Sequence, residues 1–295
     1  MIKKSAYLSS LIFSVILVFS VVASCFAVML CINVNSKNAV KLFDDNSLDN
    51  VILKEINGYY DEQYYASGIP SSVYMTAIDS EYIKESGHIC IEKAFETLKT
   101  GHEYTVNLPE NSKLDTSIET FLSDYAEQSD VKKDEKYDKK LSSVKSSAYE
   151  TIISKSDIFK FRTINSKGIL SKLSVFYRNR YLLTGAVCGL TFFIAVILFV
   201  INRKNKSLFL YWTGISSLIA GVSGIAVSAY LLASKYFDAF SIKQHSVFTA
   251  YTETMYKLAQ AFLTIEIAVT VIGIIFIVIF SIINEKKNTD DKKSK

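Results

Sequence analysis

Long apolar stretches alternate with polar ones along this chain. Four apolar stretches are almost free of charge: residues 5–34, 181–201, 208–233 and 261–283. A helix needs about 20 apolar residues to cross the hydrocarbon core of a bilayer. In lipid, only helices and closed barrels pair all of their backbone groups. The pattern therefore predicts an α-helical integral membrane protein with four transmembrane helices.

The polar segment 35–180, between the first and second apolar stretches, has apolar residues at spacings of three and four, which is typical of amphipathic helices. The sequence predicts a helix around Leu48, Ile52, Ile56, Tyr59 and Tyr60 and a second helix over 79–98. A third predicted helix is capped by Asp115 and has Ile118, Phe121, Leu122 and Tyr125 on one face. A long helix is predicted from KKDEKYDKK onward, and a last one from Ser166 straight into the second span. We expect one mostly α-helical extracytoplasmic domain, which is long enough to bury its own core.

The N-terminal segment, residues 1–34, has two interpretations. Val22-Ala23-Ser24-Cys25 has the form of a bacterial lipobox, which would place cleavage before Cys25 and a lipid on its thiol. A signal peptide, however, has an apolar core of only about 7–15 residues, whereas this run continues to Val34. A retained transmembrane helix is therefore favoured, and lipidation of Cys25 is the alternative.

Basic residues in short loops predict the orientation of the spans. If the N-terminus is inside, the inner segments carry ten basic residues (Lys3, Lys4, Arg203, Lys204, Lys206, Lys286, Lys287, Lys292, Lys293 and Lys295) and the outer loop 234–260 carries three (Lys235, Lys243 and Lys257). Arg178 and Arg180, just outside the second span, oppose this orientation mildly. The prediction is a multi-pass protein of the cell (plasma) membrane, with both termini inside and residues 35–180 outside.

The two segments that flank the fourth span are polar. The outer loop 234–260 contains Phe248, Tyr251, Met255 and Leu258 at helical spacing. This pattern predicts either a helix that lies at the membrane interface or an outward extension of the fourth span. Residues 284–295 form a polar cytoplasmic tail that we expect to be disordered.

Composition narrows the class of protein. The net charge is only +4, and the basic residues are mixed with acidic ones or lie beside the spans, so no nucleic-acid partner is expected. Cys90 is the only cysteine in segment 35–180, which therefore has no internal disulfide. Aromatic residues at the ends of the spans, Trp212 among them, are typical of the membrane interface.

Candidate chemistry is sparse. His88, Cys90 and His102 match no standard spacing of zinc ligands. The sequence has no HExxH, GxSxG, P-loop or GxGxxG motif. We therefore expect a protein that is not an enzyme, with no cofactor and no metal.

Glu266 is the one acidic residue within an apolar stretch. An ionisable group near the centre of a bilayer costs about 2.5–3.5 kcal/mol. It could bind a cation, relay a proton or pair with a partner helix. Alternatively, because it lies close to the outer end of the span, it could reach water or Lys257.

Small residues recur at four-residue spacing in the second and third spans, where they allow helices to approach closely. They are Gly185 and Gly189 in the second span, and Ser217, Gly221, Gly224 and Ser228 in the third. We expect them to pack the second span against the third within one chain, with association between copies of the chain as the alternative.

Three functions remain open. The layout of one span, a large outer domain and three further spans resembles that of the FtsX/MacB-type permease subunits of ABC systems, although no motif carries this resemblance. The inner loop 202–207 is short for a contact with an ATPase. The favoured hypothesis is an outer domain that binds a protein partner or senses the envelope, in part through its many tyrosines. A small transporter or channel that uses Glu266 is the third.

Overall fold

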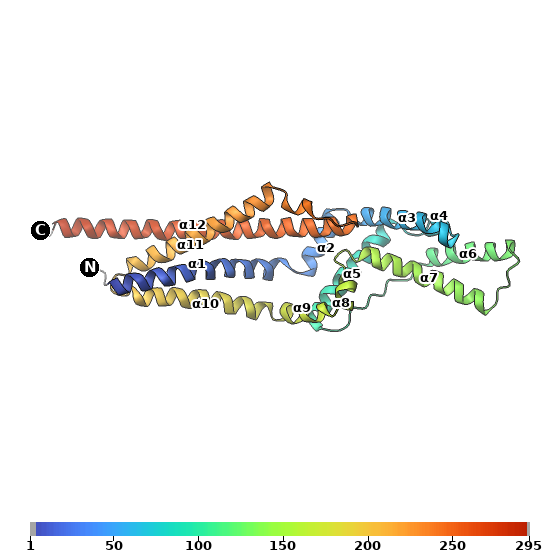
Figure 1. Ribbon diagram of the computed structural model, residues 1–295, viewed down its shortest axis with the longest axis horizontal. Helices are drawn as coiled ribbons and strands as arrows, with labels where there is room; N and C mark the ends of the chain where they lie inside the picture. The colour runs from blue at the N-terminus through green and yellow to red at the C-terminus, as the bar shows by residue number, and fades with distance from the viewer. Residues whose placement is uncertain (1–3, 294–295) are drawn as a thin grey trace. The chain divides into compact units, whose positions relative to one another are not determined.

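The protein is α-helical in every regular element that the structure describes, apart from one short 3₁₀ turn (Figure 1). This computed structural model describes residues 4–293, and the side chains of residues 6–286. Lys3 and Lys295, and the side chains of Lys4, Lys287, Lys292 and Lys293, on which the predicted orientation partly rests, lie outside these described residues. The predicted fold class is confirmed, because four long apolar helices are present and the segment between the first and second is helical.

The chain divides into two compact units. We call residues 1–34, 179–239 and 255–295 the helical bundle, and residues 35–178 and 240–254 the intervening domain. The bundle contains α1 (Lys4–Asn33), α10 (Arg180–Ile201), α11 (Ser207–Ala233), the 3₁₀ turn η1 (Tyr236–Ala239) and most of α12 (His245–Lys293). The intervening domain therefore includes a segment, 240–254, that lies outside the range predicted for it.

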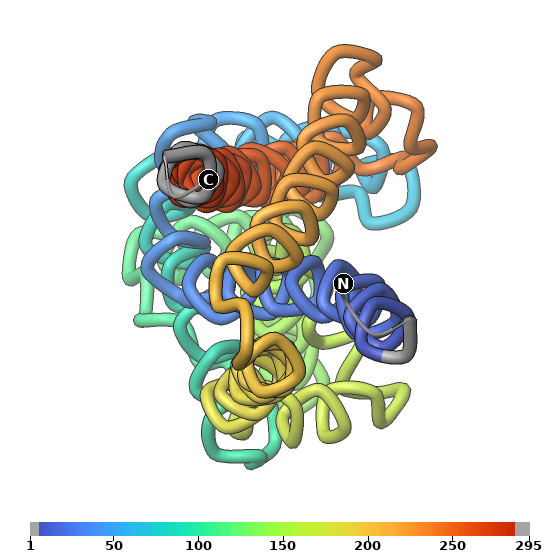
Figure 2. Tube along the Cα trace, turned by 90° about the vertical axis from the view of Figure 1, so that its left-hand side faces the viewer, coloured from blue at the N-terminus to red at the C-terminus, as the bar shows by residue number. Residues whose placement is uncertain are grey.

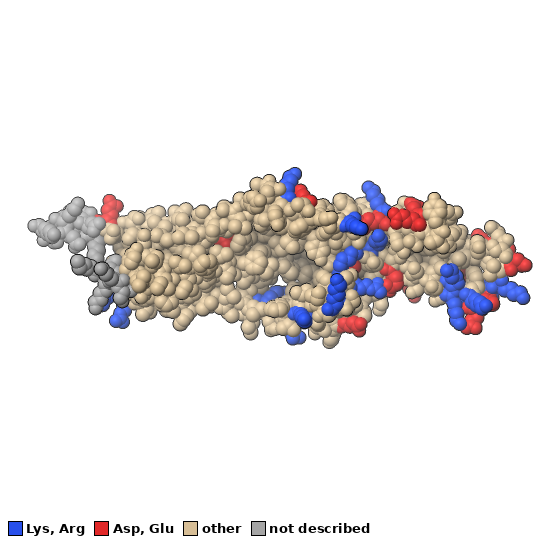
Figure 3. Space-filling view, viewed as in Figure 1, with Lys and Arg blue, Asp and Glu red and all other residues tan. Residues whose placement is uncertain are grey.

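The surface of the bundle is apolar, as lipid exposure requires. The helices long and apolar enough to cross a membrane cover Ala6–Asn33, Arg180–Ile201, Ser207–Ala233 and His245–Lys286. Large apolar side chains such as Phe19, Leu182 and Phe192 are exposed on their outer faces. In Figure 3 the charged side chains gather over the intervening domain and are scarce over the long apolar helices. Exposed apolar area on this scale marks an interaction surface, and a bilayer is the environment that it fits.

Helix α1 packs against both α10 and α11 through hydroxyl groups (Figure 2). The hydroxyl groups of Ser14 and Ser216 are 2.8 Å apart, and Ser24 Oγ is 2.8 Å from Thr191 Oγ1. At the other end of α1, Asn202 Nδ2 donates to Ser10 Oγ at 3.0 Å. Interhelical hydrogen bonds of this kind contribute about 0.6 kcal/mol each in a bilayer. Several such hydrogen bonds along one face of α1 fix its register relative to α10 and α11.

An apolar cluster lies beside these hydrogen bonds. Leu17, Ile194, Leu198 and Trp212 are buried together there. Trp212 is only 6% exposed, so its ring packs within the bundle near the start of α11. Its ring meets the edge of Tyr7, with centroids 5.4 Å apart.

The intervening domain is built from short and medium helices. They are α2 (Ser36–Asp45), α3 (Leu48–Ser67), α4 (Ser71–Met75), α5 (Ser80–Thr100), α6 (Ser112–Gln128), α7 (Glu135–Ser156), α8 (Phe161–Ser166) and α9 (Ile169–Arg178). Apolar residues on one face of these helices are buried, among them Ile52 of α3, Ile91 of α5 and Ile152 of α7. The amphipathic character predicted from the spacing of apolar residues is thereby confirmed for these three helices.

Two predicted helix boundaries are wrong for local reasons. The cap of α6 is Asn111, whose Oδ1 accepts the N–H of Leu114 at 3.1 Å, so the helix begins one turn before the predicted cap, Asp115. The segment from Ser166 does not run unbroken into the second span. Asn179, at φ −91° and ψ 6°, leaves the helical geometry and separates α9 from α10.

The first turns of α12 belong to the intervening domain and are held there by Glu55 of α3. One carboxylate oxygen accepts the Ser246 N–H at 2.7 Å, and the other accepts the Ser246 hydroxyl at 2.9 Å and Gln244 Nε2 at 3.0 Å. A carboxylate at a helix N-terminus pairs backbone donors that have no partner within the helix. Glu55 therefore acts as a cap for α12 that is supplied from another helix.

The polar segments around the fourth span differ from their predictions. Within 234–260 only residues 234–244 are non-α-helical, because α12 begins at His245 and continues without a break. Of the two alternatives for this loop, the structure contains the extension of the fourth span. The predicted disordered tail is helical as far as Lys293, since Glu and Lys are good helix formers and no Gly or Pro interrupts them.

The Glu55 cap gives a first prediction. Replacing Glu55 with Ala removes the acceptor of three hydrogen bonds and lowers the free energy of unfolding of the domain by about 1.5–3 kcal/mol. Hydrogen–deuterium exchange of the full chain in detergent measures this, with faster exchange expected at the start of α12. Glu62→Ala, at an exposed position of the same helix, is the matched control. Equal exchange in both variants would contradict the assignment of the cap.

The fate of the N-terminal segment gives a second prediction. Cleavage before Cys25 would remove Ser10, Ser14, Ser20 and Ser24, which all bond to α10, to α11 or to Asn202. We expect the mature protein to retain them, because the bundle would lose its central helix otherwise. Intact-mass measurement of wild type and Cys25→Ala checks this. Equal processing in the two proteins is expected, whereas a chain that begins at a lipidated Cys25 would refute it.

Candidate functional site

A groove lies in the intervening domain where the end of α3 meets the hairpin of α6 and α7. The hairpin closes through three local hydrogen bonds. Val131 N–H donates to the Ala126 carbonyl oxygen at 2.8 Å, and Asp134 Oδ1 accepts the N–H groups of Lys136 at 2.9 Å and Tyr137 at 3.2 Å. Asp134 is thereby the N-cap of α7. These bonds set where α7 begins relative to the end of α6.

The third wall of the groove is the turn after α3. Gly68 ends this helix at φ +71°, and its N–H donates to the Tyr64 carbonyl oxygen at 2.8 Å. This backbone conformation favours glycine. The Ile69 N–H then donates to Ser67 Oγ at 3.1 Å, and the Ile69 side chain is buried. The turn brings Ile69 to the groove.

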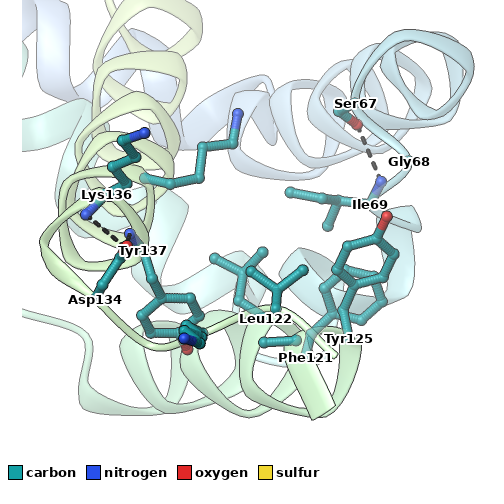
Figure 4. A pocket seen from close by; sticks show the side chains of 13 residues that line it. Ser67, Gly68, Ile69, Phe121, Leu122, Tyr125, Asp134, Lys136 and Tyr137 are labelled. Carbon is teal, nitrogen blue, oxygen red and sulfur yellow. Dashed lines mark hydrogen bonds between the residues drawn. The ribbon is translucent and has the colours of Figure 1, made fainter. Parts of the chain in front are cut away.

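The groove has a volume of about 510 Å³ (Figure 4). Its lining residues are Ser67, Gly68, Ile69, Phe121, Leu122, Tyr125, Ala126, Val131, Lys132, Asp134, Lys136, Tyr137 and Lys140. This volume lies in the range of ligand sites, which is about 300–1,000 Å³.

The lining joins an apolar floor to a basic rim. Phe121 and Leu122 are half-buried, and Tyr125 is 58% exposed, although the sequence pattern placed all three on the buried face of α6. Only Ile118 of that predicted stripe is fully buried. Three lysines against one aspartate make the lining net positive. The groove suits an elongated apolar group that also carries negative charge.

The tyrosines of α3 and α4 divide between core and surface. Tyr60 and Tyr74 stack with ring centroids 3.8 Å apart, and burial raises the pKa of both phenol groups. Tyr65, by contrast, is 93% exposed and does not line the groove. Tyr60 and Tyr74 therefore belong to the core of the domain, whereas Tyr65 belongs to its surface.

Glu266 lies within α12 and is 0% exposed. The sequence left open that the Glu266 carboxyl group reaches water at the end of the span, but in the structure this group is enclosed by protein. Its carboxyl group lies against α11, where a Cβ added to Gly224 would be 2.5 Å from Glu266 Cδ. The Cys25 side chain of α1 interacts with the same carboxyl group. Three helices of the bundle thus enclose this residue.

The small residues of the third span pack against the fourth span, not the second. A Cβ on Gly221 would lie 2.9 Å from both the Glu266 carbonyl oxygen and the Thr270 backbone nitrogen. Ser217, Gly224 and Ser228 are buried along α11 as well. In contrast, a Cβ on Gly185 or Gly189 would meet no described atom within 4 Å. The predicted pairing of the second and third spans through these residues is therefore wrong; Thr184 and Thr191 are the residues through which α10 bonds to α1.

The residues His88, Cys90 and His102 do not form a metal centre. His88 Nε2 is 2.8 Å from Asp44 Oδ1, His102 is exposed, and Cys90 is buried, which raises the pKa of its thiol to about 12. Partial burial raises the pKa of the Asp44 carboxyl group, but the hydrogen bonds from His88 and Lys84 have the larger combined effect. The pKa of Asp44 therefore lies below its usual value. Among the described residues, no group of three His, Cys, Asp or Glu side chains could hold a metal ion.

Several residues that pack the helices of the bundle together were not singled out in the sequence. Ser10, Ser14 and Ser20 of α1 are buried, and Gly273 of α12 would place a Cβ 2.8 Å from the Leu218 backbone nitrogen. Isolated serines and a lone glycine in otherwise apolar spans were the available signals. Cys25, the proposed lipidation site, is buried in the middle of α1.

The chain matches no protein-family model, no curated protein sequence and no solved structure.

The contact between α11 and α12 gives a third prediction. Gly221→Ala forces a Cβ against the α12 backbone and lowers the free energy of unfolding by about 1–3 kcal/mol. Gly185→Ala is the matched control, because its Cβ would meet open space. Thermal unfolding of the purified full chain in detergent compares the two. A loss of stability in Gly185→Ala equal to that in Gly221→Ala would contradict the packing described above.

Proposed function

We propose that this protein is a non-enzymatic, multi-pass protein of the cell membrane that binds a protein partner on the outer side through its intervening domain. The groove between α3, α6 and α7 is the observation that carries this proposal. Its apolar floor, exposed Tyr125 and three lysines are typical of a surface that accepts part of another protein. The partner segment would be apolar along one side and acidic.

The proposed orientation rests on the positive-inside rule. The connection between α10 and α11 is short and carries Arg203, Lys204 and Lys206, whereas the loop before α12 carries Lys235 and Lys243. Placing the more basic connection inside puts the intervening domain outside. An outer domain fits a role in binding an envelope partner or sensing the envelope.

Crosslinking in cells, followed by mass spectrometry of the proteins that co-purify with the tagged full chain, tests the proposal. Tyr125→Ala should reduce recovery of the partner about tenfold or more, because exposed aromatic side chains often dominate an interface. Tyr65→Ala, the same change at an exposed tyrosine outside the groove, should leave recovery unchanged. Equal recovery with both variants would refute the groove as the binding site.

Two other functions predict different outcomes, one in this experiment and one in a second experiment. Recovery of a stoichiometric cytosolic ATPase, insensitive to Tyr125→Ala, would favour the ABC permease subunit instead. Transport is the other candidate, and the observation that favours it is the buried carboxyl group of Glu266. Ion flux in reconstituted vesicles that Glu266→Gln abolishes would support transport.

A further inference from the structure

Among the described residues, no strong hydrogen-bond donor reaches the carboxyl group of Glu266, and the thiol of Cys25, a weak donor, is the polar side chain that approaches it. The residue is 0% exposed, and neither carboxyl oxygen reaches a donor or acceptor with hydrogen-bonding geometry among the described residues. Buried polar groups in proteins are nearly always paired, so an unpaired one calls for an explanation. An ionised carboxylate in this position would be far less stable than a neutral acid.

The walls of the site leave no room for a metal ion beside the carboxyl group on the α11 side. A Cβ on Gly224 would be 2.9 Å from Glu266 Oε1 and 2.5 Å from its Cγ, so the side chain lies directly on the bare backbone of α11. One residue after Cys25 and one turn before Glu266, the rings of Phe26 and Phe262 meet edge to face, with centroids 6.2 Å apart. The surroundings are therefore both close and apolar.

Among the side chains that the structure describes, no cation faces Glu266. From α1 it meets the Cys25 thiol, which interacts with the carboxyl group and in turn lies near Cys188 of α10. Helix α11 contains no Asp, Glu, His, Lys or Arg at all. On α12 itself, Thr270 directs its hydroxyl group to the Glu266 backbone carbonyl at 2.8 Å and not to the carboxyl group. Neutral thiols and backbone cannot balance a negative charge.

We propose that Glu266 is a proton-binding site. The neutral acid is the form that packs against Gly224, with the proton on one carboxyl oxygen. Loss of that proton leaves a carboxylate that needs water, and water reaches it only when α11 and α12 separate. Uptake of one proton by one carboxylate is the whole chemical step. This inference does not depend on the proposed function of the groove.

Infrared spectroscopy of the full chain in lipid bilayers tests the proposal, because a protonated carboxyl group has its own C=O stretching band. At neutral pH, wild type should show this band and Glu266→Gln should lack it. Asp157 is the matched control. It is also buried, at 3% exposed, and this burial raises the pKa of its carboxyl group. Hydrogen bonds from the N–H groups of Phe161 and Arg162 lower that pKa, but by less. Asp157→Asn should keep the Glu266 band.

Two outcomes would overturn the proposal. The band could be present in Glu266→Gln and lost in Asp157→Asn, which would assign the proton to Asp157. The spectrum of wild type could also show no carboxylic acid band at neutral pH, which would make Glu266 a carboxylate. Neither the spectrum of wild type nor that of Asp157→Asn needs Glu266→Gln to fold, and a band that persists in Asp157→Asn supports Glu266 as its source.

Discussion

The close approach of the α11 backbone to α12 is the contact on which the helical bundle depends. Lipid tails are as apolar as leucine, so burial of apolar surface does not by itself drive these helices together. Gly221 and Gly224 remove the side chains that would hold α11 away from α12. On its other side, α11 bonds to α1 through Ser216 and Ser14. The same approach encloses the Glu266 carboxyl group, so helix packing and the state of this group are linked.

The groove exists because α6 and α7 extend beyond the apolar core that they help to build. Ile118 and Ile152 are fully buried, whereas further along α6 Leu122 is only half-buried and Tyr125 is exposed. Local caps hold the hairpin in place without filling the space beside it. The groove, which is partly apolar and rimmed by lysines, therefore results from the length of α6 and α7. The caps at the ends of these helices keep the space between them open.

The sequence predicted those features that depend on local composition. The four spans and the stripe of Ile52 and Ile56 follow from hydropathy and periodicity alone, and the structure contains them. Contacts between helices could not be predicted in this way, since Gly185 and Gly221 look alike in sequence and differ only in what lies opposite them. The cap at Asn111 was missed for a different reason: several residues there can cap a helix, and tertiary packing decides among them.

The groove and the Glu55 cap could not be predicted because each joins segments far apart in the chain. The groove needs Ile69 beside Leu122, and the cap needs Glu55 beside Ser246. Periodicity reports which face of a helix is apolar, not which partner covers it. Glu266 was singled out correctly as unusual, whereas its complete enclosure depends on α1 and α11 together.

The place of residues 240–254 in the intervening domain also has a consequence for biosynthesis. Domains generally fold as their residues emerge from the ribosome, N-terminal parts first. Here the partner of Glu55 is made only after α10 and α11 have been synthesised. The last segment of the domain, 240–254, therefore joins it only after most of the chain has been made, and the serines of α1 meet their partners only after α10 and α11 have been made. Neither unit can complete its native contacts early, so both reach their final form in the last stage of synthesis.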